Sequence, residues 1–94
     1  MLDWTERRPE HLIDLHGMTV VQAEVATLQF LKAQRKARPG AIVEIVTGRG
    51  RAGGGAPIRT RVGVLLRQLK ADSAVVRDFA RSLSEGSWLV RLSG

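Results

Sequence analysis

The sequence predicts an α/β fold with the element order β-α-β-α-β-β. Two short apolar runs, 11–15 and 41–46, have the length and composition of strands. Each run is followed by a longer segment in which apolar residues recur with the period of a helix. Two more short apolar segments, 74–79 and 88–92, follow near the end and have the spacing of a hairpin.

The first strand, 11–15, leads directly into a helix. Alternation along a strand places Ile13 and Leu15 on one face, and Asp14 and His16 on the other. An acid and an imidazole are therefore expected side by side at the end of this strand.

The first helix is predicted over residues 20–37. Thr19 and Gln22 form a capping-box pattern at its start, and Pro39 with Gly40 ends it. Val21, Val25 and Leu28 form an apolar ridge, flanked by Ala23, Phe30 and Leu31, and this arc is broad enough for more than one side of the helix to be covered.

The second strand, 41–46, is nearly continuous in apolar residues, as a buried parallel strand would be. Residues 47–56 follow as a loop with five glycines in ten positions. Pro57 suits the first turn of the next helix. That helix has one clear apolar stripe, formed by Ile58, Val62, Leu65, Leu66 and Leu69.

The composition bounds the class of protein. The chain has 94 residues, 44% of them hydrophobic and 26% charged, which is typical of one globular domain. It has no cysteine, which excludes a disulfide scaffold, a thiolate zinc site and a cysteine nucleophile. No apolar run is long enough for a membrane span, and residues 1–10 do not resemble a secretory signal. We therefore expect a cytoplasmic protein without membrane contact.

The charge is concentrated in one segment. The net charge is +6, and residues 45–71 contain no Asp or Glu. The same segment contains Arg49, Arg51, Arg59, Arg61, Arg67 and Lys70. A basic segment on an otherwise neutral domain is the pattern of a polyanion binder, although solvated arginines on a helix would look similar.

Topology brings the two motifs together. A β-α-β crossover makes the first two strands parallel, so both end at the same edge of the sheet. In open α/β sheets this carboxyl edge is where ligands bind. We therefore expect Asp14, His16, the glycine loop and the start of the second helix to share one surface.

This constellation suggests chemistry on a phosphodiester. Loop amides and helix N-terminal N–H groups bind anions, and Arg49 and Arg51 lie within the loop. His16 could exchange a proton with a hydroxyl or water, while Asp14 could orient His16 or bind a divalent cation. The alternative is that Asp14 and His16 are only structural.

The loop also matches the dinucleotide-binding pattern G-x-G-x-x-G, but that interpretation is weak. A dinucleotide site needs an acid at the end of the following strand, whereas Asp72 lies in the turn after the helix. Two arginines in the loop favour an open polyanion over a buried cofactor.

The motifs Asp14-Leu15-His16-Gly17 and Thr47-Gly48-Arg49-Gly50, with Ile58-Arg59-x-x-Val62 after them, resemble those of the small MutS-related (Smr) domain family. The resemblance covers residues 11–92. It implies a two-layer α/β sandwich, with a mixed four-stranded sheet and two helices, similar to the C-terminal domain of bacterial translation initiation factor three. It also implies nucleic-acid binding and an endonuclease or nicking activity on DNA or RNA.

The resemblance assigns roles to particular residues. It implies that Asp14 and His16 are catalytic. The sequence departs from the family at Ala52, where members often have serine, and in the short loop 85–87. Residues expected to bind nucleic acid are Gly17, Thr47, Gly48, Arg49, Gly50, Arg51 and Arg59.

Residues 1–10 are expected to be an N-terminal arm or linker, and 11–94 the Smr-like domain. The predicted function is nucleic-acid binding with endonuclease activity, and a DNA-, RNA- or ribosome-binding module without catalysis is the alternative. A divalent cation, Mg²⁺ or Mn²⁺, would be needed if the substrate is DNA, with Asp14 as a ligand. The sequence does not determine the oligomeric state.

Overall fold

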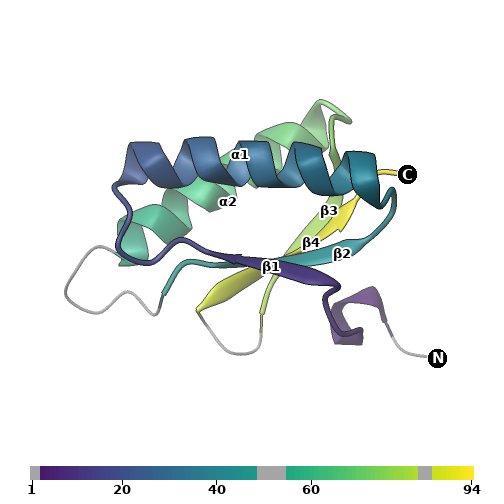
Figure 1. The fold of residues 1–94 in the computed structure, drawn as a ribbon, viewed down its shortest axis with the longest axis horizontal. Coiled ribbons are helices and arrows are strands. Elements are labelled where there is room, and N and C mark those ends of the chain that lie inside the picture. Colours follow the sequence, from purple (N-terminus) through teal and green to yellow (C-terminus); the bar gives the residue numbers. More distant parts are fainter. Residues whose placement is uncertain (1–2, 49–54, 83–85) are drawn as a thin grey trace.

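The computed structural model describes residues 3–48, 55–82 and 86–94 (Figure 1). In chain order, the elements are the 3-10 turn η1 (Trp4–Glu6), β1 (His11–Asp14), α1 (Val20–Ala37), β2 (Ile42–Val46), α2 (Gly55–Ala71), β3 (Val76–Arg81) and β4 (Ser87–Leu92). This order confirms the predicted β-α-β-α-β-β pattern. Among the described residues, neither helix is long and apolar enough to cross a membrane.

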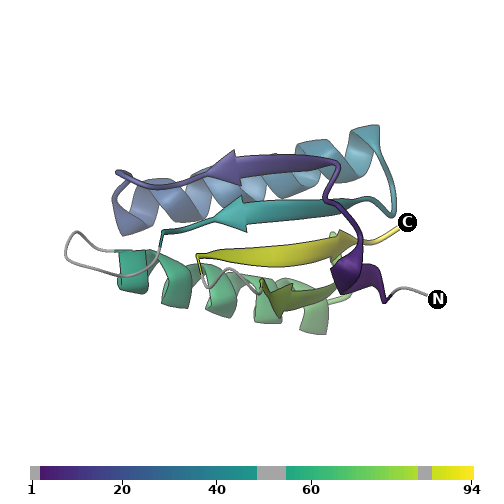
Figure 2. The ribbon, with the colours of Figure 1, turned by 90° about the horizontal axis from the view of Figure 1, so that it is seen from below.

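The four strands form one mixed sheet in the order β1-β2-β4-β3. β1 and β2 are parallel, with Ile13 opposite Ile45, and β4 is antiparallel to both β2 and β3. Both helices lie on one face of the sheet, which makes the two-layer sandwich that the resemblance implied (Figure 2). Of the residues that the structure describes, those around η1 lie across one end of the other face, and we call this the uncovered face.

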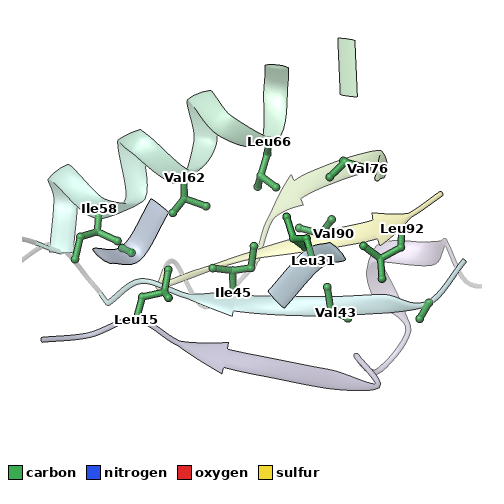
Figure 3. Packing of buried hydrophobic residues seen from close by; sticks show 12 residues of the cluster. Leu15, Leu31, Val43, Ile45, Ile58, Val62, Leu66, Val76, Val90 and Leu92 are labelled. Atoms are coloured by element: carbon green, nitrogen blue, oxygen red, sulfur yellow. The ribbon is translucent and has the colours of Figure 1, made fainter. Parts of the chain in front are cut away.

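The core lies between the sheet and the two helices (Figure 3). Leu15, Ile45 and Val90 from the sheet side are fully buried, and so are Val62 and Leu66 from α2. The apolar stripe predicted for the second helix therefore does face the core. Leu65 is only half-buried and lies at the margin of that stripe.

The Val21–Val25 part of the apolar arc of the first helix does not face the core, whereas the flanking residues Ala23 and Leu31 do. Val21 is 73% exposed and Val25 is 50% exposed. The buried face of α1 instead runs through Ala23, Thr27 and Leu31, at i, i+4 and i+8. The helix is apolar on more than one side, so its periodicity alone permitted two faces, and contact with α2 and the sheet selects one of them.

The third strand begins later than predicted, at Val76 instead of residue 74. Ser73 and Val75 adopt φ values of 55° and 63°, in the left-handed region that a strand cannot contain. The strand extends to Arg81 and contains an irregularity between Val76 and Asp78. This shift places Arg81 directly opposite Trp88 in the sheet.

Candidate functional site

Asp14 and His16 lie at the end of β1 and contact each other. The Asp14 carboxylate accepts a hydrogen bond from the backbone N–H of His16, with a distance of 3.0 Å between N and Oδ1. The His16 imidazole Nδ1 lies 3.4 Å from the same oxygen. The His16 side chain is 81% exposed, so its second ring nitrogen is open to solvent. An imidazole that lies beside a carboxylate and is otherwise largely exposed is suited to exchange a proton with a substrate.

Gly17 completes the turn that presents His16. The turn is closed by a hydrogen bond from the Met18 N–H to the Leu15 carbonyl, at 3.1 Å. Gly17 has a φ of 85°, which side chains other than glycine rarely adopt. Leu15 is completely buried and anchors the turn in the core. Local backbone geometry therefore directs His16 away from the domain.

Thr47 and Gly48 begin the glycine loop at the neighbouring strand end. The backbone N–H groups of both residues donate to the carbonyl of Gly86, at 2.8 and 3.1 Å. Thr47 is only 1% exposed, and Gly48 has a φ of 93°. In this arrangement, Thr47 and Gly48 fix the base of the loop to the β3–β4 connection and do not offer free amides. The predicted contacts Arg49, Gly50 and Arg51 lie outside the described residues.

The predicted convergence at one edge is present in the fold. Asp14 pairs with Val46, so β1 and β2 end together, and both α1 and α2 begin at this end (Figure 2). The helix N-termini make this end favourable for anions. However, Asp14 lies in register with Val46 on the uncovered face, whereas α2 begins in the other layer.

Arg59 lies in the first half of α2, where its backbone carbonyl accepts a hydrogen bond from the Trp88 indole at 3.2 Å. In the described part of the chain, no carboxylate forms an ion pair with its guanidinium. Arg61, by contrast, pairs with Glu24 of α1 at 3.3 Å. Among the predicted contacts that the structure describes, Arg59 is therefore the one whose charge is available to a ligand.

The residues do not form a metal centre by themselves. Within residues 3–48, 55–82 and 86–94, no three His, Cys, Asp or Glu side chains gather as metal ligands. A divalent cation at Asp14 would have one carboxylate from this chain and would take its other oxygens from water and substrate phosphate, an arrangement typical of Mg²⁺.

The Asp14–His16 pair lies on an open surface and not in either of two hollows in the structure. One hollow, of about 520 Å³, lies between η1 and the uncovered sheet face, beside Glu44 and Leu89. The other, of about 590 Å³, lies between the beginnings of α1 and α2, beside Val20 and Pro57. An exposed carboxylate–imidazole pair beside helix N-termini fits a polymer better than a small enclosed ligand.

Together, the fold and this edge define a class: a two-layer α/β domain that presents an Asp-x-His pair next to a glycine loop on a basic segment. The family model of the Smr domain matches residues 13–93. The chain belongs to the Smr domain family, a family associated with nucleic-acid binding and with nucleases.

A solved structure supports the same assignment. The chain is similar to the Smr domain of Thermus thermophilus MutS2, with 25% sequence identity and a TM-score of 0.74. The match covers 89% of this chain and 99% of that one. A comparison with curated proteins found no match.

Proposed function

We propose that this domain is an endonuclease that binds DNA or RNA at the carboxyl edge of β1 and β2, with Asp14 and His16 as its catalytic residues. The observation that carries the proposal is the contact between these two side chains. Asp14 holds Nδ1 of His16 at 3.4 Å, while the imidazole is otherwise open at the end of the molecule where both helices begin. Gly17, Arg49, Gly50, Arg51 and Arg59 complete the proposed binding site, and Thr47 and Gly48 support it by fixing the base of the glycine loop.

On RNA, the pair can act without a metal. Nε2 of His16 takes the proton of a ribose 2′-hydroxyl, the 2′-oxygen forms a bond to phosphorus, and the bond to the 5′-oxygen breaks. The leaving oxygen takes a proton from solvent, which yields a 2′,3′-cyclic phosphate. Asp14 holds the imidazole in place and stabilises the imidazolium that forms.

On DNA, the attacking group must be water because deoxyribose has no 2′-hydroxyl. A divalent cation would activate that water and neutralise the phosphate, with Asp14 as its protein ligand. Chelation distinguishes the two routes: EDTA should abolish cleavage of DNA and leave metal-independent cleavage of RNA unchanged.

The test compares the wild type with His16→Ala and Asp14→Asn on end-labelled single- and double-stranded DNA and RNA. We expect both variants to lose at least about a hundredfold in cleavage rate, because a positioned acid–base group typically contributes that much. Affinity should stay within a few-fold, and binding should weaken as salt rises. Equal background cleavage by the wild type and both variants would refute the catalytic proposal.

A second candidate is a non-catalytic nucleic-acid- or ribosome-binding module. The observation that favours it is the hydrogen bond from the His16 backbone N–H to Asp14, because this bond gives the carboxylate a structural role in the turn. This candidate predicts salt-sensitive binding without cleavage on any substrate. A cytoplasmic location, with residues 11–94 as the functional domain after an N-terminal arm of residues 1–10, belongs to both candidates.

A further inference from the structure

A second aromatic and basic surface lies between α2 and the edge strand β3, and we call it the Trp88 surface. It consists of Arg59, Gly63 and Lys70 from α2, Phe79 and Arg81 from β3, and Trp88 from β4. Arg59 and Lys70 belong to the basic segment 45–71, whereas Gly63, Phe79, Arg81 and Trp88 had no predicted role in binding.

Trp88 is the fixed centre of this surface. Its indole N–H donates to the Arg59 carbonyl at 3.2 Å. One side of its six-membered ring lies against Gly63, so closely that a Cβ there would be 2.8 Å from Cζ2. Phe79 contacts it edge to face, with 5.7 Å between ring centroids and 62° between ring planes. Both rings remain partly exposed.

Cations cover these rings from the solvent side. The Arg81 guanidinium lies 5.8 Å from the Trp88 ring centroid, and the Lys70 ammonium lies 5.9 Å from that of Phe79. Lys70 is partly neutralised by Asp78, at 2.9 Å. Arg81 has no ion pair among the described residues and is exposed. A guanidinium stacked on an aromatic ring still presents its N–H groups outward, where phosphate can accept them.

The charges continue along α2. Arg67 is exposed and also has no carboxylate partner in the described structure. It follows Arg59 by eight residues, which corresponds to about 12 Å along a helix axis. Arg59 and Arg67 precede and follow Gly63 by four residues each, so both flank the side of α2 that contacts Trp88.

The Trp88 surface adjoins the proposed cleavage edge. Asp14, Val46 and Ser87 form one row across β1, β2 and β4 on the uncovered face, and Trp88, the next residue of β4, points to the opposite face, toward α2. Two strand spacings separate Asp14 from Ser87, or about 10 Å. A nucleic-acid strand bound at the cleavage edge would therefore have to pass around the end of the sheet at β4 to reach the Trp88 surface.

We propose that the Trp88 surface binds an unpaired stretch of the nucleic acid, with a base stacked on the Trp88–Arg81–Phe79 cluster and phosphates paired with Arg59, Arg67 and Arg81. The proposal rests on the proposed nucleic-acid binding. Base stacking on exposed rings requires a base that is not already stacked in a duplex, and it tolerates any sequence. The substrate class is therefore single-stranded nucleic acid, or a duplex with a single-stranded extension.

The test uses the fluorescence of Trp88 as a direct reporter. The chain has two tryptophans, so Trp4→Phe leaves Trp88 as the only one. This variant, with Asp14→Asn added to prevent cleavage, is titrated with a short oligo(U) and with a blunt duplex of the same length. We expect oligo(U) to quench Trp88 and to bind several-fold more tightly than the duplex, which should cause little quenching.

A charge variant tests the contact independently of the ring. Arg81→Gln should weaken oligo(U) binding about five- to tenfold and reduce the slope of log affinity against log salt by about 0.7, the value for one phosphate contact to a single strand. Lys36→Gln is the matched control, because Lys36 is an exposed cation in the last turn of α1, away from this surface.

The outcomes separate this proposal from the proposed function. Salt-dependent binding of oligo(U) without quenching of Trp88, and with wild-type affinity in Arg81→Gln, would overturn the proposal and leave nucleic-acid binding intact. Absence of salt-dependent binding to any nucleic acid would overturn both. Quenching by poly-glutamate equal to that by oligo(U) would also overturn it, because the surface would then not recognise bases.

Discussion

Gly63 determines how closely α2 lies on the sheet. Gly63→Ala would place a methyl group 2.8 Å from Trp88 Cζ2. The ring cannot easily move, since Arg59 holds its N–H and Phe79 lies at its edge. Overpacking costs about 1–3 kcal/mol, and alanine recovers about 1 kcal/mol of helix propensity. We expect the free energy of unfolding to fall by about 1 kcal/mol in urea denaturation.

The control for this prediction is Thr60→Ala, at an exposed position of the same helix. This substitution raises helix propensity without creating a steric contact, so the free energy of unfolding should stay the same or rise slightly. A Gly63→Ala variant as stable as Thr60→Ala would mean that Trp88 does not limit the approach of α2.

Asp78 couples the stability of the fold to pH. The hydrogen bond from Lys70 lowers the pKa of Asp78 below its ordinary value of 3.8, against a smaller opposing effect of burial. A lowered pKa means that folding favours the carboxylate, so this stabilisation is complete above the ordinary pKa and is lost as the pH falls through the folded pKa. Both side chains are almost half exposed, so the pair contributes only about 0.5 kcal/mol.

Asp78→Asn should therefore lower the free energy of unfolding by about 0.5 kcal/mol at pH 7 and by less at pH 3. Denaturation curves at the two pH values measure the difference. Asp72→Asn, in the turn after α2, removes a carboxylate without breaking the Lys70 pair. An Asp78→Asn effect that is equally large at both pH values would exclude the ion pair as its cause.

At the scale of elements, α1 shows that the buried face of a helix cannot always be identified from the sequence. Thr27 is completely buried, and its hydroxyl has no hydrogen-bond partner among the described residues. A polar residue in the middle of the true face made the Val21–Val25 face look more regular. Both faces have helical periodicity, so only packing against α2 and the sheet distinguishes them.

Exchanging valine and threonine should change the free energy of unfolding differently on the two faces of α1. Thr27→Val removes a buried hydroxyl without a partner and should raise the free energy of unfolding by about 1 kcal/mol. Val25→Thr, on the half-exposed face, should change it by less than about 0.5 kcal/mol. Thermal unfolding of the two variants measures both effects. Marked destabilisation by Val25→Thr would instead support the ridge that the sequence suggested.

Across the whole molecule, local patterns were enough to predict the order of elements and the edge where the motifs meet. The capping box of α1, the Pro57 helix start and the Asp14–His16 spacing are each encoded within a few residues. They were predictable because local sequence determines them, and because parallel strands must end at one edge.

Features that depend on long-range register could not be predicted in the same way. The contact between Arg81 and Trp88 requires that β3 end at Arg81, whereas the predicted strand ended at residue 79. Left-handed backbone at Ser73 and Val75 moves the strand, and neither residue type signals such a conformation. Arg81 and Trp88 lie on either side of the β3–β4 loop, and this position was the indication in the sequence that the two residues could pair.

The position of β4 has a consequence for how the domain is made. It is the last strand in the chain, yet it lies in the sheet between β2 and β3, which have no other contact with each other through strand pairing. Until residue 92 has been synthesised, β3 has no strand to pair with, and β2 has an open edge in addition to that of β1. Folding during translation must therefore wait for nearly the whole domain, and the nascent chain is exposed to aggregation and proteolysis until then.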